Sequence, residues 1–184
     1  MVKLVRFSKT ILIVTLAFAL CGCNTGKKDN AVKDEKHAAV ANPWTESNED
    51  GVFEATGHSI KAPENATEVR YSYCADDKMA QVTYIQDGID WTYRIKESSD
   101  LEDISGMYYE WAVSDEGTVS GRKAVYMGYS EAGEDSEYID NLYCVQVVNW
   151  YDAGSSYSLS ACGYNLNGID IQVYAEQIYE ASWK

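Results

Sequence analysis

The sequence predicts an α+β domain: an antiparallel meander sheet of about six to eight strands, with a short N-terminal helix and a C-terminal helix packed on one face. Three observations support this prediction. Apolar residues make up 46% of the 184 residues, which is enough for a core. From residue 69 onward apolar and polar residues alternate, as they do in strands with one buried face. At Ile171, Tyr174, Ala175 and Ile178 the apolar spacing becomes that of a helix.

Residues 1–22 are predicted to be a secretory signal and stand outside the fold. Lys3, Arg6 and Lys9 precede an apolar run at residues 10–20. This run is shorter than the about 20 residues that a membrane-spanning helix needs. A short apolar run behind a basic start is typical of a cleaved secretory signal.

The run ends in Leu20-Cys21-Gly22-Cys23, which resembles a bacterial lipobox. The small Gly22 stands directly before Cys23, whereas Cys21 is less suitable because the bulky Leu20 precedes it. The resemblance implies diacylglycerol and further fatty acyl chains such as palmitate on Cys23, cleavage before Cys23, and a place on the outer face of the bacterial cell membrane. Two or three acyl chains anchor a protein firmly. An ordinary signal with a chance cysteine is the alternative.

Residues 23–42 are predicted to be a flexible tether, because they mix charges with small residues and contain no aromatic residue. His37 lies in this segment and is expected to be solvated. Residues 43–184 are predicted to form a single α+β domain, which holds all five Trp and all 15 Tyr. Cleavage of the signal changes the net charge from −14 to −17, and the tether contributes +1, so the domain carries −18.

The start of the domain is expected to hold a short helix over residues 47–55. Ser47, followed three residues later by Asp50, resembles a capping box. Gly57 is a suitable residue to end this helix. Trp44, just before it, is expected to pack against the domain.

Residues 58–61 are expected to form a short strand, and residues 63–66 a turn. His58 precedes this turn and has no cluster of Cys, His or carboxylate residues near it in the sequence. We therefore expect His58 at the surface or in a capping role.

Two turns predict the register of the first hairpins. Asp87-Gly88 is a strong two-residue turn, since glycine adopts positive φ easily, and residues 75–78 form the loop before it. The pairs expected opposite each other are Tyr84 with Trp91, Val82 with Tyr93, Tyr73 with Ala80 and Tyr71 with Val82. Both registers place the apolar residues on one face, which is the face we expect to be buried.

The period of two continues in four further expected strands, at residues 107–113, 122–129, 139–151 and 156–161. The apolar positions of the first of them are Met107, Tyr109, Trp111 and Val113. Residues 152–155 are expected to join the last two strands as a hairpin. The C-terminal helix follows Asn167-Gly168, with Asp170 at its favoured N-terminal end, and is expected to cover the sheet.

Three cysteines, Cys74, Cys144 and Cys162, remain after lipidation of Cys23, so at least one thiol is unpaired within a single chain. Cys144 and Cys162 lie in the two strands joined by residues 152–155, where the numbers of opposite residues sum to about 307. These two cysteines could therefore form a disulfide outside the cytoplasm. Free thiols packed as small core residues are the alternative.

The composition argues against several functions. With 15 Lys and Arg against 29 Asp and Glu, the chain lacks the basic surface that nucleic acid needs. Its two His leave no His-rich zinc site. The acidic runs at 100–103 and 131–137 lack the spacing of an EF-hand and are expected to be solvated. Without a nucleophile elbow or a phosphate loop, we expect no metal, no cofactor, no catalytic residue and no enzyme.

Tyrosines offer the remaining candidate site. Most fall on the face assigned to the core, whereas Tyr108, Tyr126, Tyr143 and Tyr151 are assigned to the other face. Exposed together, these four would form a binding surface, since a tyrosine ring offers contact area and its hydroxyl stays in water. A second layer packed against that face is the alternative.

The C-terminal part resembles a known group of proteins. Trp150, Gly154, Tyr157-Ser158-Leu159-Ser160, Asp170, Ala175 and Ile178 are similar to the closing motif of domains of unknown function in uncharacterised lipoproteins of Gram-positive (Firmicutes-type) bacteria. Asp103-Ile104-Ser105-Gly106, after Thr92-Tyr93-Arg94, is similar to such lipoproteins as well. The resemblance covers residues 43–178, and it implies an α+β fold with an antiparallel sheet and no catalytic residue. A more distant likeness is to lipoprotein carriers that hold acyl chains.

Two functions are expected from these features. The first is a membrane-anchored, non-catalytic binding or interaction module, which contacts a protein, a glycan or a small ligand through an aromatic face or a groove between sheet and helix. The second is a carrier of an apolar or lipid-like ligand, held between the sheet and the C-terminal helix in a cavity of about 300 Å³ or more. In both, the lipid anchor makes the membrane a partner.

Overall fold

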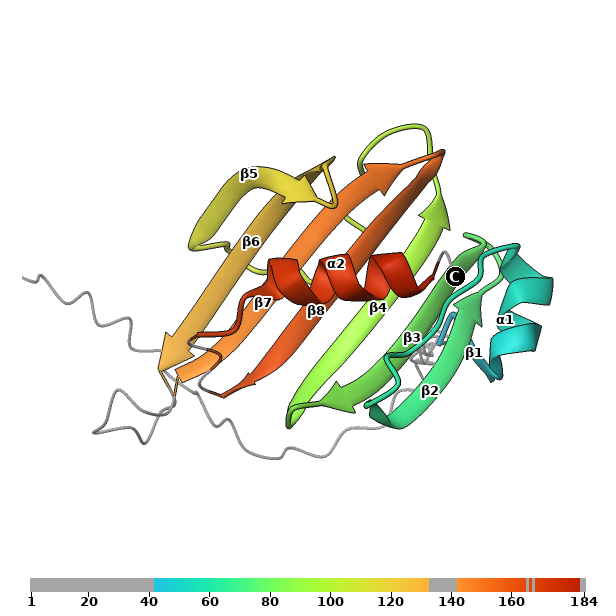
Figure 1. Ribbon diagram of the computed structural model, residues 1–184, viewed down its shortest axis with the longest axis horizontal. Helices are drawn as coiled ribbons and strands as arrows, with labels where there is room; N and C mark the ends of the chain where they lie inside the picture. The colour runs from blue at the N-terminus through green and yellow to red at the C-terminus, as the bar shows by residue number, and fades with distance from the viewer. Residues whose placement is uncertain (1–41, 133–141, 165, 167, 183–184) are drawn as a thin grey trace, which may run out of the picture. The chain divides into compact units, whose positions relative to one another are not determined.

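Eight strands form one antiparallel sheet, and two helices accompany it (Figure 1). The computed structural model describes residues 42–132, 142–164, 166 and 168–182. Within them the elements are β1 (Trp44–Ser47), α1 (Glu49–Thr56), β2 (Thr67–Cys74), β3 (Met79–Gln86), β4 (Ile89–Glu97), β5 (Val113–Val119), β6 (Arg122–Ala132), β7 (Leu142–Asp152), β8 (Ser155–Tyr164) and α2 (Ile171–Ala181). The predicted fold class, α+β with an antiparallel meander sheet and two helices, is confirmed. Cys23, the signal and the tether up to residue 41 lie outside the described residues.

The sheet is two four-stranded meanders joined side by side. Its strand order is β1-β2-β3-β4-β8-β7-β6-β5, so the last strand pairs with the fourth. The chain must therefore pass from β4 in the middle of the sheet to β5 at its far edge. Residues 98–112 make this passage, and we call them the strap.

The hairpin registers agree with those predicted from the turns. Val82 lies opposite Tyr93 and Tyr84 opposite Trp91, on either side of the Asp87-Gly88 turn. The β2–β3 pairs are also those predicted, and β7 joins β8 through the two residues between Asp152 and Ser155. The apolar residues of these strands share one face, which is buried.

The two faces of the sheet differ in chemistry. Opposite residues of neighbouring strands share a face, so Val82, Tyr93 and Leu159 mark one face and Gln81, Arg94 and Ser158 mark the other. We call the first the helix face, because α2 packs on it, with Tyr174 stacked on Trp91 at 4.5 Å between ring centroids. We call the second the strap face.

Aromatic rings fill the space between the helix face and α2. Trp150 stacks on Tyr157 at 5.3 Å and on Tyr93 at 6.0 Å, and Tyr179 of α2 meets both Trp150 and Tyr157 edge-on. Ala175 and Ile178 of α2 are also fully buried. Aromatic contacts of this kind add to the stabilisation from burial alone.

α1 begins and ends, and α2 begins, close to the predicted positions. The N-cap of α1 is one residue later than expected, because Asn48 and not Ser47 accepts the hydrogen bond from Gly51 N, at 2.8 Å. It ends at Gly57, whose φ of 80° is left-handed. Asp170 caps α2 through a hydrogen bond from Gln172 N.

Two predicted strands are wrong. Residues 107–111 belong to the strap and have no strand partner, since they follow the passage across the sheet. Residues 58–61 are irregular and lie on the helix face, where Ala62 N donates to the Tyr71 hydroxyl at 3.4 Å. The strand β1 was not predicted; it begins at Trp44 and pairs with β2.

Candidate binding surface

The strap is held on the sheet by Arg94. The Arg94 Nη1 donates to the carbonyl oxygens of Ile104 at 3.0 Å and of Ser105 at 2.5 Å, and its Nε donates to Gln81 Oε1 at 2.8 Å. The guanidinium also lies over the Trp44 ring, 4.9 Å from its centroid. Burial lowers the pKa of Arg94, but a guanidinium stays charged in the neutral range.

Further polar contacts fasten the strap along β7 and β8. Asp103 Oδ1 accepts from Asn149 Nδ2 at 3.1 Å and from Ser105 N at 3.0 Å. Ser156 Oγ accepts from Glu102 N at 2.9 Å and lies 2.8 Å from Ser98 Oγ. Buried polar groups need hydrogen-bond partners. Because these contacts supply them, the strap can cover the polar face of the sheet.

Small side chains lie beneath the strap. Ser156, Ser158 and Ser160 of β8 alternate along the strap face, and each is at most 2% exposed. Their size lets the strap backbone approach the sheet closely. We therefore assign the serine run of β8 to packing and not to chemistry.

Beyond these contacts the strap reaches a group of aromatic residues. Tyr109 stacks on Tyr129 of β6 with ring centroids 4.6 Å apart, and Trp111 meets Tyr109 edge-on at 5.6 Å. Tyr143 of β7 meets Tyr164 of β8 edge-on at 5.5 Å. We call these five residues the aromatic cluster.

The two parts of the aromatic cluster are neighbours on the strap face. Tyr129 lies opposite Val145 and Glu131 lies opposite Tyr143, so Tyr129 and Tyr143 are diagonal neighbours within reach of each other. Tyr164 is 65% exposed, and Tyr109, Trp111, Tyr129 and Tyr143 are half-buried. The rings are therefore held in place while part of their surface stays open to solvent.

Polar groups surround these rings. The Tyr129 hydroxyl donates to Glu131 Oε2 at 2.7 Å, and this hydrogen bond raises the pKa of Tyr129. Burial, followed by the nearby Cys162, raises the pKa of Tyr143 to about 12. Burial also raises the pKa of the Cys162 thiol, so this thiol is protonated at neutral pH and is a poor nucleophile.

The four tyrosines predicted as a binding surface do not come together. Tyr143 belongs to the aromatic cluster, and Tyr108 lies beside it in the strap, 96% exposed. Tyr126 is on the helix face, where its hydroxyl donates to Thr118 O at 2.7 Å. Tyr151 is on the strap face at the opposite end of β7.

Four members of the aromatic cluster were not among those residues. Tyr109 and Trp111 were assigned to a core-facing strand, and Tyr129 and Tyr164 were not selected. The strand order is needed to see that β6, β7 and β8 lie side by side and bring these residues together. The only signal of the cluster in the sequence was the high density of aromatic residues.

No disulfide joins Cys144 and Cys162. Cys144 lies opposite Gly163 and Cys162 opposite Val145, so the two thiols point to opposite faces of the sheet. Side chains alternate between faces, and an offset of one residue therefore separates them. Cys74, Cys144 and Cys162 are all free.

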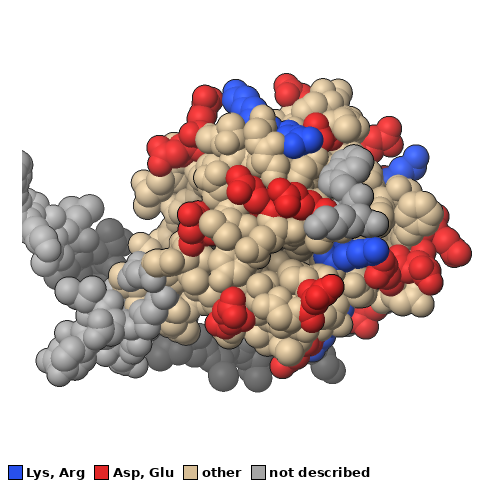
Figure 2. Space-filling model, in the orientation of Figure 1, with Lys and Arg blue, Asp and Glu red and all other residues tan. Residues whose placement is uncertain are grey.

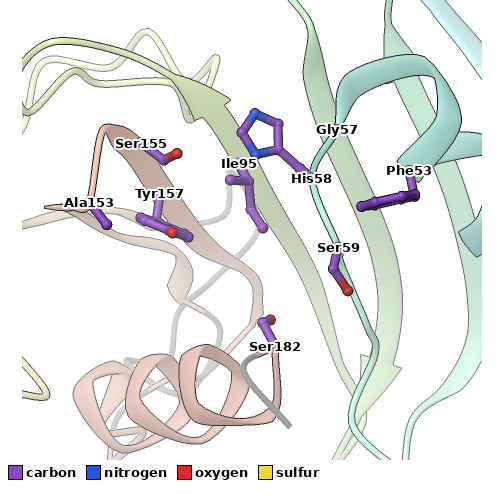
Figure 3. Close-up of a pocket in the computed structure, with 9 residues that line it drawn as sticks. All are labelled: Phe53, Gly57, His58, Ser59, Ile95, Ala153, Ser155, Tyr157 and Ser182. Atoms are coloured by element: carbon purple, nitrogen blue, oxygen red, sulfur yellow. The ribbon is translucent and has the colours of Figure 1, made fainter.

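A second candidate site is a pocket of about 240 Å³ near the β7–β8 hairpin (Figure 3). Contrary to expectation, His58 is half-buried there, and burial lowers its pKa, partly opposed by Glu97. Its Nε2 is buried and has no hydrogen-bond partner among the described residues. The lining residues are Phe53, Gly57, His58, Ser59, Ile95, Ala153, Ser155, Tyr157 and Ser182.

Within the described ranges, no group of three or more His, Cys, Asp or Glu side chains could hold a metal ion. Neither of the helices described is long and apolar enough to cross a membrane. Comparison of the chain with protein-family models, with curated proteins and with solved structures gave no match. The candidate site is therefore judged by its own geometry, and that geometry defines an aromatic surface on an antiparallel sheet.

Proposed function

We propose that this protein is a lipoprotein on the outer face of the bacterial cell membrane, and that its domain is a non-catalytic binding module. The lipobox-like Leu20-Cys21-Gly22-Cys23 supports the anchor, with lipid on Cys23. The aromatic cluster supports the binding role, and it is the surface through which the module contacts its partner.

The stacking of Tyr109 on Tyr129 is the observation that carries this proposal. It joins a loop residue to a strand residue, so the aromatic surface exists before any ligand arrives. A surface held in its bound form loses little conformational entropy on binding. Tyrosine and tryptophan are also the residues that dominate binding surfaces, because each ring offers a large contact area.

The position of the aromatic cluster suits a tethered module. The described chain begins beside β1, which is one edge of the sheet, whereas the cluster lies on β6, β7 and β8 towards the other edge (Figure 1). The first described residues therefore lie away from the cluster, which agrees with separate places for the anchor and for the binding surface.

The packing of α2 favours this function over that of a carrier. A carrier needs space between the sheet and the helix, and the side chains there are stacked aromatic rings. Trp91 contacts Tyr174 directly, and Tyr179 contacts Trp150 and Tyr157.

The anchor is tested by replacing the lipidated residue. In a Gram-positive host, the wild-type protein is expected in the membrane fraction and Cys23→Ser in the medium or as uncleaved precursor. Cys21→Ser is the matched control and should stay in the membrane fraction with lipid attached. Mass spectrometry of the mature N-terminus identifies the modified residue. An unmodified Cys23 would overturn the proposed anchor.

The binding role is tested with arrays of cell-wall glycans and of peptides. A ligand of the proposed module should bind the wild-type lipoprotein, and Tyr109→Ala with Tyr129→Ala should weaken it by about tenfold or more. Tyr151→Ala is the matched control, since Tyr151 is a half-buried tyrosine on the same face but away from the cluster. Equal loss in both variants, or binding that neither affects, would exclude the aromatic cluster as the surface.

A further inference from the structure

We infer that the aromatic cluster binds a basic peptide segment of a partner protein, with an arginine or lysine side chain lying on the tyrosine rings beside Glu131. This inference rests on the proposed function and names the chemistry of the ligand. It comes from the charges around the cluster and not from the rings alone.

Two exposed carboxylates lie beside the rings on the strap face. Glu131 is directly opposite Tyr143 and accepts the hydrogen bond from the Tyr129 hydroxyl. Asp90 is directly opposite Cys162, which is a diagonal neighbour of Tyr143. The cluster therefore presents aromatic faces next to negative charge.

Basic residues of the described strap face are distant from the cluster. At about 3.3 Å per residue, Lys123 lies about 26 Å along β6 from Glu131. Arg70, on β2, is four strands or about 19 Å from Tyr143 on β7, although it lines one pocket with Asp90. Arg94 is nearer the middle of the sheet, but its guanidinium is engaged by Gln81 and by the carbonyls of the strap. Lys96 lies at the other end of β4, opposite Ser156, and pairs with Glu102. Glu131 is therefore the carboxylate beside the rings that no basic residue of the described strap face approaches.

A guanidinium or ammonium group fits this arrangement. A cation is attracted to the face of a tyrosine ring, and a nearby carboxylate strengthens the site by pairing with it. The planar guanidinium of arginine can stack on a ring and bond to a carboxylate at the same time. A neutral glycan could stack on the tyrosine rings, but it would gain nothing from the carboxylates beside them.

The net charge of the domain agrees with a basic partner. The domain carries −18, and on the face shown in Figure 2 the acidic side chains are spread widely and the basic ones are few. Such a field attracts a basic segment over long range and repels anionic cell-wall polymers. Because the acidic residues are spread over the surface, this field does not define where on the domain a basic segment binds. The aromatic cluster defines that place.

The experiment uses the mature lipoprotein in neutral detergent micelles. The probes are fluorescent hexa-arginine, hexa-lysine and hexa-glutamate peptides and a neutral N-acetylglucosamine oligomer, read by anisotropy at low and moderate salt. The two basic peptides are expected to bind and the hexa-glutamate peptide is not. Glu131→Gln should weaken hexa-arginine binding about fivefold or more, because it removes the charge and keeps an acceptor for Tyr129.

A matched variant separates specific binding from general attraction. Glu54→Gln makes the same change of charge on an exposed position of α1, and it should weaken binding by less than about twofold. Tyr129→Phe keeps the ring and should retain most of the affinity, whereas Tyr129→Ala should lose it. Circular dichroism confirms that each variant is folded.

Three outcomes would overturn the inference. Equal weakening by Glu131→Gln and Glu54→Gln would mean that the peptides bind only through net charge. Binding of the neutral oligomer through Tyr129, without binding of the basic peptides, would reject a basic ligand and leave the proposed binding module standing. If no glycan or peptide binds in a manner that depends on the aromatic cluster, the proposed function fails together with this inference.

Discussion

The guanidinium of Arg94 donates to the backbone carbonyl of Ser105 across the strap face, at 2.5 Å. Arg94 belongs to β4 and Ser105 to the strap, so this contact joins the middle of the sheet to the segment that leads to β5. The same strap carries Tyr109 onto Tyr129. The aromatic cluster therefore depends on a polar contact made several residues earlier in the strap.

Arg94→Met should destabilise the domain. It leaves the carbonyls of Ile104 and Ser105 and the amide of Gln81 without their charged donor, and bonds to charged groups contribute about 1.5–3 kcal/mol each. We expect the free energy of unfolding to fall by about 3 kcal/mol in urea titrations. Arg70→Met, at an exposed position, should change it by less than about 0.5 kcal/mol. Equal effects of the two variants would contradict the role of Arg94.

Gly106→Ala tests how closely the strap lies on Arg94. A Cβ at Gly106 would come within 2.5 Å of Arg94 Nη1, and the φ of this residue is 68°. We expect a loss of about 2 kcal/mol, from steric contact and from backbone strain. Gly88→Ala controls for the strain, because Gly88 has a φ of 75° and no atom within 4 Å of its Cβ position; about 1 kcal/mol is expected there. Equal losses would show that the strap can move away from Arg94.

Thiol counting tests the cysteine arrangement. The denatured mature protein should show the three thiols of Cys74, Cys144 and Cys162 with Ellman's reagent, before and after treatment with dithiothreitol. The reducing agent should not change the melting temperature, because no bridge is present to break. Two further thiols after reduction would mean that two of these three cysteines are joined, which would contradict the arrangement of three free thiols.

The stability should fall at high pH, in part through Tyr179. Burial, then the hydrogen bond from the Tyr179 hydroxyl to Asp152, raises the pKa of Tyr179 above its ordinary value of 10.0. Because the folded state holds this proton more tightly, the stabilisation is complete below about pH 10 and is lost as pH rises through the raised pKa. Urea midpoints at pH 9 and pH 11 measure the loss, and it should be smaller in Tyr179→Phe. Burial raises the pKa of Tyr84 and Tyr93 as well, so part of the loss should remain. An equal loss in Tyr179→Phe would remove Tyr179 from this explanation.

Local features of the chain were enough to predict the β2–β3, β3–β4 and β7–β8 hairpins. The Asp87-Gly88 turn sets the β3–β4 register because a two-residue turn leaves one way to pair the strands. The helical spacing of Ile171, Ala175 and Ile178 correctly predicted the buried side of α2. These features depend on residues close in sequence, so the spacing of those residues is enough to predict the hairpin register and the buried side of the helix.

The strap shows why the remainder could not be predicted. Met107, Tyr109 and Trp111 alternate with polar residues, and alternation predicts a strand. Alternation indicates which side chains lie on the same side of an extended chain. A strand also needs a neighbouring strand that forms hydrogen bonds with its backbone, and alternation does not show whether one is present. The Tyr109 ring packs against Tyr129, and Trp111 packs against Tyr109. Both residues bury part of their apolar surface in this way although their own backbone forms no strand.

The sequence by itself determined the fold class, the registers of the β2–β3, β3–β4 and β7–β8 hairpins, the ends of α1 and the start of α2 to within two residues, and the acidity of the domain. Only the tertiary structure decided that β8 pairs with β4, that the strap crosses the polar face, and that Cys144 and Cys162 lie on opposite faces. The physical reason is the range of the interactions. A turn and a helix stripe are set by neighbours in the chain, whereas the Tyr109–Tyr129 stack and the Arg94–Ser105 contact form only after distant strands have taken their places in one sheet.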